Sequence, residues 1–396
     1  MGYVSEYLIC IIKAALTDYK LEYPKEEFDW NELLRLSQKH KITALVGTTL
    51  LSEKIELPEQ IKQSFLKDIN KNILLDTMQE NERRKLSQAF EKENLNYMLM
   101  KGYNLKKLYP ESYMRYMCDI DILIDNEIYE KYESVMLKLN YEKQTESDHE
   151  HIFTKKSIIN IELHKSIVPT YYKDLYNYYG NGWKYAQSSA DSSRYEYSLE
   201  NQYVFLIVHL AKHYQGSGIG ISHFIDIYVM NNKCSYDKSY VQTELEKLGL
   251  VRFHTNVLQL LDYWFCDKQP DKSILDMNEY VISGGAYGSM KNHLATETML
   301  GIEKYGNEKS ARRAKRLEVI FPTVKRLAEE FLILDKYPVL YPVFLVYRNV
   351  RAVLFRRNKV KNYMSTINYK NDEYVKELSS HLHDVGLKKD EKWSDF

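Results

Sequence analysis

The stretch Arg115-Tyr116-Met117-Cys118-Asp119-Ile120-Asp121-Ile122-Leu123-Ile124 decides the fold of this chain. Acidic and aliphatic side chains alternate in its second half, which is typical of a β-strand with one buried face. Asp119 and Asp121 then point to the same side, while the isoleucines beside them enter the core. Carboxylates held so close repel each other unless a cation or a proton lies between them. On this pattern, replacing Asp121 by Asn is expected to relieve the repulsion and to leave the stability of the metal-free protein equal or higher.

A divalent metal ion that prefers oxygen ligands is the natural partner of such a pair. Mg²⁺ is commonly held by one or two carboxylates together with the phosphates of a substrate. A third acid, Glu162, lies in the apolar run 158–164, where it shares one strand face with His164. If the two strands are neighbours, Glu162 joins Asp119 and Asp121. The three carboxylates together indicate phosphate chemistry.

A second signal lies upstream, where the apolar run 97–100 leads into Lys101 and Gly102. A buried strand that ends at a glycine allows backbone N–H groups to approach a phosphate. Together these features resemble the uncharacterised nucleotidyltransferase family of the polymerase-β-like nucleotidyltransferase superfamily. The residues that carry the resemblance are Leu99-Met100-Lys101-Gly102, Leu105, Tyr109-Pro110, Arg115, Asp119-x-Asp121 and Glu162-Leu163-His164.

The resemblance is strongest over residues 96–170, and it implies a set of site residues. In that superfamily a glycine turn holds the triphosphate, and an Asp-x-Asp pair with a third carboxylate binds two Mg²⁺ ions. By position these residues are Gly102, Asp119, Asp121 and Glu162. The superfamily usually has a second small residue after the glycine, whereas this chain has Tyr103.

The implied reaction is the Mg²⁺-dependent transfer of a nucleoside monophosphate from a nucleoside triphosphate, such as ATP, to an acceptor hydroxyl, with release of pyrophosphate. Two metal ions can stabilise both the attacking and the leaving oxygen of such a displacement. Lys101 and Arg115 are the candidate nucleotide-binding cations, although each can instead pair with a nearby acid. The acceptor can be a small molecule, a protein or an RNA end. The alternative, which Tyr103 favours, is a nucleotide-binding or partner-binding module with the same fold and little turnover.

Composition is that of an ordinary globular protein, with 396 residues, 44% of them hydrophobic and 28% charged. Lysine plus arginine equals aspartate plus glutamate, 55 of each, so no overall field attracts nucleic acid. The four cysteines show no C-x-x-C spacing, which suits a reducing cytoplasm and gives no reason to expect zinc. The first six residues resemble neither a secretion signal nor a myristoylation signal, so a cytoplasmic location is expected.

Helical periodicity flanks the predicted strands on both sides. We therefore predict an α+β fold with three parts: an N-terminal helical region (1–95), a small mixed β-sheet nucleotidyltransferase core (96–175) and a larger C-terminal helical region (176–396). The polar segment 174–194, rich in Tyr, Asn, Gly and Ser, is predicted to be a loop or an irregular connection that closes the core.

Two histidines, His209 and His213, lie four residues apart on a predicted helix. That spacing can hold a metal, but no Glu follows the first histidine and no third ligand is evident. Because members of the resembling family carry a histidine-rich helix and an aspartate here, we expect His164, His209, His213 and Asp226 to line the acceptor pocket. The glycine-rich segment 215–220 is predicted to be a flexible joint that lets this group close over the site.

A basic group lies beside the apolar stretch 337–355 near the C-terminal end. Its members are Arg348, Arg351, Arg356, Arg357, Lys359 and Lys361. A basic amphipathic helix can contact a membrane surface or an acidic partner, but a solvated face is the commoner outcome. The longest apolar window is interrupted by two prolines and is too short to cross a bilayer.

Overall fold

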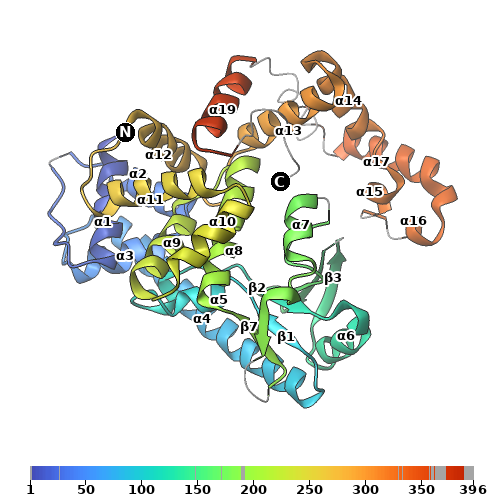
Figure 1. Ribbon diagram of the computed structural model, residues 1–396, viewed down its shortest axis with the longest axis horizontal. Helices are drawn as coiled ribbons and strands as arrows, with labels where there is room; N and C mark the ends of the chain where they lie inside the picture. The colour runs from blue at the N-terminus through green and yellow to red at the C-terminus, as the bar shows by residue number, and fades with distance from the viewer. Residues whose placement is uncertain are drawn as a thin grey trace.

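The computed structural model (Figure 1) describes residues 2–25, 27–147, 149–170, 172–188, 192–328, 330, 331, 333–355, 357, 361 and 372–387. Over these residues the chain has the predicted α+β fold, with one seven-stranded sheet and helices on both sides of it in the sequence. The basic positions Arg356 and Lys359 lie outside the described residues.

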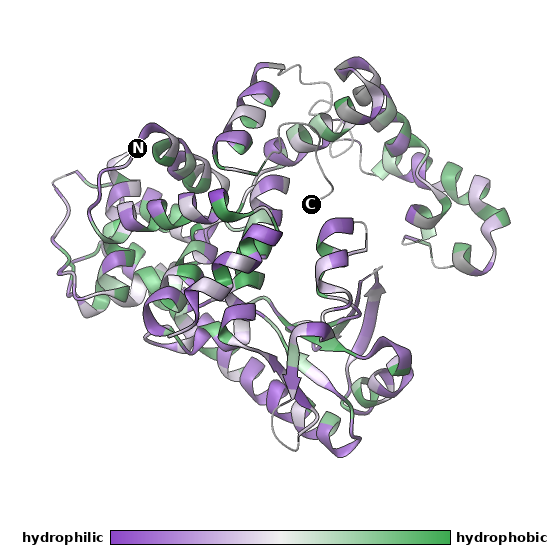
Figure 2. Cartoon of the chain, viewed as in Figure 1, coloured by the Kyte–Doolittle hydropathy of each residue, from purple (hydrophilic) through white to green (hydrophobic). Residues whose placement is uncertain are grey.

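The sheet has the strand order β3-β4-β5-β2-β1-β7-β6. Its strands are β1 (Tyr97–Leu99), β2 (Asp119–Ile124), β3 (Glu142–Glu146), β4 (Glu150–Lys155), β5 (Ile159–His164), β6 (Ala186–Ser188) and β7 (Arg194–Tyr197). The pairs β2/β5 and β1/β7 are parallel, and the other four pairs are antiparallel. β3 is an exposed edge strand that is largely hydrophilic in Figure 2. Polar side chains on an edge strand disfavour its pairing with another chain.

The isoleucine face of β2 is buried, as its alternation predicts. Ile120, Ile122 and Ile124 pack in one core with the C-terminal half of α4 (Glu59–Lys92) and with α6 (Tyr129–Lys138). The acidic positions of β2 are only half-buried and lie on the opposite face. Burial of one face therefore determines which way the two aspartates point.

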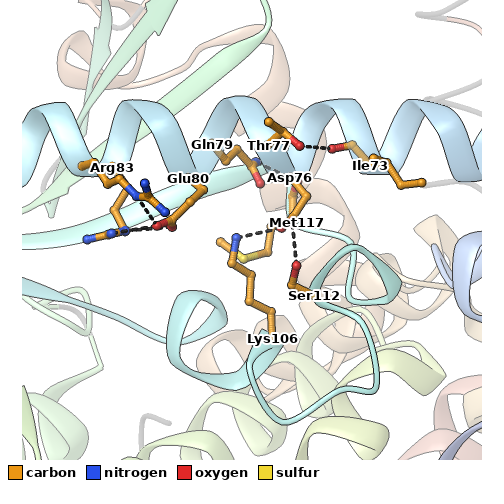
Figure 3. Close-up of polar contacts among 10 residues, drawn as sticks. Ile73, Asp76, Thr77, Gln79, Glu80, Arg83, Lys106, Ser112 and Met117 are labelled. Atoms are coloured by element: carbon orange, nitrogen blue, oxygen red, sulfur yellow. Dashed lines mark hydrogen bonds and ion pairs between the residues drawn. The ribbon is translucent and has the colours of Figure 1, made fainter.

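The segment that leads into β2 is anchored on α4 (Figure 3). Asp76 accepts hydrogen bonds from Lys106 Nζ at 2.7 Å and from Ser112 Oγ at 2.6 Å. Gln79 Nε2 donates to the carbonyl oxygen of Met117 at 3.0 Å. These contacts tie the turn before β2 to one long helix, so the strand begins at a fixed place.

The remaining helices follow in order. Before and within the sheet region they are α1 (Tyr3–Leu16), α2 (Trp30–Lys39), α3 (Thr43–Ser52), α5 (Gly102–Lys106), η1 (Ser112–Met114), η2 (Asn126–Ile128), α7 (Lys173–Tyr179) and η3 (Trp183–Tyr185). After it come α8 (Leu199–Gly216), α9 (Ile221–Lys233), α10 (Lys238–Lys247), α11 (Val251–Phe265), α12 (Lys272–Gly284), α13 (Met290–Tyr305), α14 (Glu308–Ile320), α15 (Val324–Ala328), α16 (Ile333–Lys336), η4 (Pro338–Leu340), α17 (Tyr341–Phe355) and α19 (Asp372–Asp384).

The predicted loop at 174–194 is wrong. Helix α7 lies within it, and strands β6 and β7 extend the sheet to Tyr197, past the expected core boundary at residue 175. Polar and aromatic residues here alternate too weakly to indicate short strands. β7 forms a strand because it pairs in parallel with β1, and this contact is not visible in the local sequence pattern.

The N-terminal and C-terminal helical regions share a single large core. Leu8 of α1, Leu45 of α3, Ile207 of α8 and Phe253 of α11 belong to one cluster, which also contains Leu123 of β2. The helices α1, α3, α8 and α11 therefore meet on the face of the sheet opposite α6 and the C-terminal half of α4. That face is the one to which the aspartates point.

The helices α14 to α17 stand away from the sheet in Figure 1. On α17, Arg348 Nε and Arg351 Nη2 pair with Glu330 at 3.3 and 2.8 Å, so part of the predicted basic group is neutralised. No helix in the described part of the chain is both long and apolar enough to cross a membrane.

Candidate active site

A cavity of about 510 Å³ lies where β2 and β5 face the helices α8 and α9. Its walls come from the carboxylate-bearing strands, the turn at 101–102, the helices α8 and α9, and the loop at 286–287. All ten residues expected to form the site line this one cavity: Lys101, Gly102, Arg115, Asp119, Asp121, Glu162, His164, His209, His213 and Asp226.

The carboxylates meet because β2 and β5 are parallel neighbours, as expected. Asp121 lies opposite Glu162, and Asp119 lies opposite Asn160, two residues earlier on each strand. Since the register is regular, the side chains of Asp119, Asp121 and Glu162 emerge on one face of the sheet. Side-chain exposures of 12% for Asp121 and 23% for Glu162 leave both partly open to the cavity.

Two cationic groups lie against the carboxylates. His164 Nε2 is 2.8 Å from Asp121 Oδ1 and 3.5 Å from Glu162 Oε2. Lys101 Nζ is 3.7 Å from Asp121 Oδ2. Burial lowers the pKa of His164, but the hydrogen bonds to Asp121 and Glu162 outweigh it and raise the pKa to about 9. His164 therefore belongs with the carboxylates more than with an acceptor.

The two aspartates differ in how well their negative charge is stabilised. Burial, and then the negative charge of Asp121, raise the pKa of Asp119 to about 6, although the Cys118 thiol donates to Asp119 Oδ2 at 3.0 Å. Burial also acts against ionisation of Asp121, but the charge of Lys101 and the hydrogen bond from His164 outweigh it and lower its pKa well below the usual range. Asp119 thus carries the negative charge that is least well balanced.

Gly102 is required by a close approach of side chains. A Cβ at this position would lie 2.5 Å from Arg115 Nη1 and 3.0 Å from Met117 Sδ. The preceding residue, Lys101, adopts a φ of 39°, which places the turn in a region that side chains rarely occupy. The structure therefore explains the glycine by packing, and its contact with a phosphate stays a prediction.

Arg115 is committed to a buried ion pair. Its Nε and Nη2 donate to the two carboxylate oxygens of Asp226 at 2.7 Å each, and Tyr109 OH donates to Asp226 Oδ1 at 2.8 Å. The pair joins the segment before β2 to α9. The structure thus shows the pairing with an acid that the sequence left open, while a role for Arg115 toward phosphate stays a prediction.

A cluster of histidines forms the helical wall. The rings of His209 and His213 on α8 are 4.4 Å apart, and His223 on α9 lies 5.7 Å from His209. Burial, together with the nearby charge of Lys101, lowers the pKa of all three, to about 4 for His223. They are therefore neutral at pH 7 and present hydrogen-bonding nitrogens. His223 was not anticipated, although its position three residues before Asp226 on one helix could have indicated it.

Two further lysines line the cavity, Lys41 and Lys212. Burial, and then the charge of Lys101, lower the pKa of Lys212 to about 8. Among the described residues Lys212 has no hydrogen-bonding or ion-pair partner, and its Nζ lies 5.7 Å from the ring centre of Tyr172. Sequence reasoning missed Lys212, although it lies directly before His213.

The segment 215–220, predicted to be a flexible joint, is packed against the loop at 285–289. A Cβ on Gly220 would lie 2.7 Å from Ala286 Cα, and one on Gly288 would lie 2.0 Å from the oxygen of Ser217. Ser289 N–H also donates to that oxygen at 2.7 Å. Close packing explains Gly220 and Gly288, and a hinge at this segment stays a prediction.

The comparison with known families agrees with this geometry. The family described as uncharacterised nucleotidyltransferase matches residues 26–266, more than half of the chain. This chain belongs to that family. The matched range contains the whole sheet and the helices α8 and α9, so it covers every wall of the cavity except the loop at 286–287. No curated protein and no solved structure matches the chain.

Proposed function

We propose that this protein is a Mg²⁺-dependent nucleotidyltransferase that moves a nucleoside monophosphate from a nucleoside triphosphate to an acceptor hydroxyl. The observation that carries the proposal is the meeting of Asp121 and Glu162 across parallel strands. They face a cavity that also holds a buried lysine without an ion-pair partner among the described residues. Carboxylates on the strands and a lysine without an ion-pair partner on α8 suit a triphosphate that carries a metal ion.

The carboxylates fit a hard divalent ion. Ligand atoms of Asp121, Glu162 and His164 lie within 4.8 Å of one another, and the raised pKa of Asp119 reports negative charge that a cation would balance. Asp119, Asp121 and Glu162 would hold the ion, which when bound supplies charge stabilisation to the phosphate and makes the acceptor hydroxyl easier to deprotonate.

The lysines would bind the phosphates. Lys101, in the turn after β1, and Lys212, on α8, both line the cavity. An incoming triphosphate would stabilise the charged form of Lys212 that burial disfavours. Because Arg115 is already paired, we assign the phosphate contacts mainly to the lysines.

The acceptor oxygen attacks the α-phosphorus, the bond to the β-phosphate oxygen breaks, and pyrophosphate leaves. The acceptor proton passes to Glu162 and then to solvent. His209 and His213, neutral and on the opposite wall, would hydrogen-bond and orient the acceptor. Asp226 is occupied by Arg115 and Tyr109, so its effect on the acceptor would be indirect.

The position of Tyr103 in the structure does not support the alternative of a binding module with little turnover. It is 8% exposed and packs in the core with α4 and the sheet, where Arg83 lies over its ring at 4.7 Å. It is not among the residues that line the cavity, so it takes no space from a nucleotide.

The test is incubation of the full chain with each of the four α-labelled nucleoside triphosphates, Mg²⁺ and an extract of small molecules, RNA and protein. Labelled product with pyrophosphate release supports the proposal. Glu162→Gln should reduce product formation far more than it weakens triphosphate binding. Tight triphosphate binding without pyrophosphate release under every condition would instead favour the binding module.

A further inference from the structure

Beside the three carboxylates, a second group of ligand side chains contains His149, Glu150 and His164. One ligand atom from each lies within 4.8 Å of the others. His149 Nε2 is 3.2 Å from Glu150 Oε2, and His164 Nδ1 is 3.8 Å from the same oxygen. Glu150 and His164 are direct partners across the antiparallel strands β4 and β5, so their side chains emerge side by side.

The ring of His164 has one nitrogen without a partner. Its Nε2 is engaged by Asp121, but its Nδ1 is buried and accepts or donates no hydrogen bond among the described residues. The side chain is only 4% exposed, so water cannot readily compensate for this nitrogen. The orphaned nitrogen lies 3.8 Å from Glu150 Oε2, and the ring centres of His164 and His149 are 6.1 Å apart.

The ring of His149 is also held in place. Its Nδ1 lies 3.2 Å from Ser147 Oγ, which leaves Nε2 for Glu150. The backbone carbonyl of His149 accepts from Lys165 N–H at 2.7 Å, and this bond ties the end of the β3–β4 turn to β5. Two imidazole nitrogens and a carboxylate oxygen are thus presented to one small volume by anchored backbone.

We propose that His149, Glu150 and His164 bind one divalent transition-metal ion of the Zn²⁺ or Co²⁺ type, separate from the Mg²⁺ of the carboxylate site. Two imidazoles and one carboxylate suit such ions, whereas Mg²⁺ prefers oxygen ligands. Asp121 would accept a hydrogen bond from Nε2–H of His164 and fix that ring, as carboxylates commonly do behind metal-bound histidines. Binding releases the proton on Nδ1 to solvent.

The experiment is a calorimetric titration of the full chain with Zn²⁺ in excess Mg²⁺ and without nucleotide, repeated with Co²⁺ and visible absorption. We expect one Zn²⁺ per chain and a Co²⁺ absorption band. Since loss of even an outer partner weakens metal sites by about tenfold or more, His149→Ala should weaken binding at least about tenfold and remove the band. Glu150→Gln provides a second variant with the same expectation.

Two matched variants separate this site from its neighbours. His213→Ala removes an imidazole from the same cavity and should leave Zn²⁺ affinity within about twofold, a few tenths of a kcal/mol. Glu162→Gln removes an outer contact of His164 Nε2, at 3.5 Å, and no proposed ligand, so it should weaken Zn²⁺ binding less than His149→Ala does. His149 has a side chain that is 24% exposed, so His149→Ala should keep the fold, which metal-free thermal unfolding checks. Unchanged binding in His149→Ala, or loss in Glu162→Gln alone, would overturn the proposal.

Discussion

Arg115 and Asp226, 111 positions apart in the chain, form a buried ion pair with two hydrogen bonds of 2.7 Å. The pair connects the segment before β2 to helix α9, so it sets the distance between the carboxylate wall and the histidine wall. Side-chain exposures of 13% and 4% mean that neither charge is well solvated if its partner is lost.

The first prediction concerns this pair. Asp226→Asn leaves the Arg115 guanidinium buried beside a neutral amide, which should lower the free energy of unfolding by about 3–5 kcal/mol. Urea unfolding at pH 7 measures the loss. The double variant Arg115→Met, Asp226→Leu should recover much of it, because no buried charge remains unpaired. Equal stability of Asp226→Asn and the unmodified protein would show that the pair does not hold α9 in place.

The second prediction distinguishes the two aspartates. The folded-state pKa of Asp119, about 6, lies above its ordinary value of 3.8, so stability falls as the pH rises from 3.8 to 6 and the full cost is present above pH 6. Asp119→Asn should therefore raise the metal-free stability at pH 7 by on the order of 2 kcal/mol. Asp121→Asn should lower it, because the lowered pKa of Asp121 reflects favourable pairing with Lys101 and His164.

This outcome corrects the expectation drawn from alternation alone, that neutralising Asp121 would relieve repulsion. Differential scanning calorimetry of both variants in chelator checks the order. Both should lose the stabilisation that Mg²⁺ with triphosphate gives. An Asp119→Asn variant that is less stable than Asp121→Asn would contradict the charge assignment.

The third prediction concerns Lys212. Its folded-state pKa of about 8 lies below the ordinary 10.5, so its charge lowers the stability of the folded protein at pH 7. This cost decreases as the pH rises from 8 to 10.5. Lys212→Met should raise the melting temperature yet weaken Mg²⁺-triphosphate binding by about tenfold, or 1.4 kcal/mol. Lys233→Met, at an exposed position on α9, is the matched control and should change neither quantity. Unaltered nucleotide affinity in Lys212→Met would remove this lysine from the site.

The fourth prediction is a pH dependence of stability set by His40, which is fully buried. Its Nε2 donates to the carbonyl of Ile282 at 3.0 Å, and its Nδ1 accepts from Ile221 N–H at 3.3 Å, so the neutral ring satisfies both partners. Burial lowers its pKa from 6.5 to about 4. Stability from this residue is therefore complete above pH 6.5 and is lost as the pH falls toward 4.

Between pH 6.5 and pH 5 the loss should be about 2 kcal/mol. His40→Gln keeps the donor to Ile282 and cannot be protonated, so the stability gap between it and the unmodified protein should shrink over this range. Urea unfolding at half-unit pH steps measures the gap. A gap that stays constant with pH would show that another buried histidine dominates the acid sensitivity.

The fifth prediction assigns the acceptor side. Replacing both His209 and His213 by Ala should leave triphosphate affinity within about twofold, a few tenths of a kcal/mol, while abolishing transfer to the acceptor. Because the rings lie on the α8 wall and carry no charge at pH 7, they have little to offer a phosphate. Titration calorimetry with triphosphate and Mg²⁺, alongside a product assay, makes the comparison. Loss of nucleotide binding in the double variant would place these rings against the nucleotide.

Several features follow from the sequence alone because they depend on neighbours a few residues away. Alternation in β2 and β5 determines which side chains enter the core, so Asp119, Asp121, Glu162 and His164 emerge on the other face. Helical periodicity places His209 and His213 together on α8, and the structure shows that Ser198 caps this helix by accepting a hydrogen bond from Asn201 N–H. The α+β fold class and the family follow from the order of these short patterns.

Only the tertiary structure determined which distant residues contact these short segments. The partner of Arg115 is 111 positions away, and the partner of β1 in the sheet is a strand that local alternation does not reveal. Burial and long-range partners likewise determined the pKa values: burial lowered the pKa of Lys212, which has no ion-pair partner among the described residues, and Lys101 and His164 lowered the pKa of Asp121 while that of Asp119 is raised. Desolvation and long-range pairing depend on the whole packed chain, which no window of sequence contains.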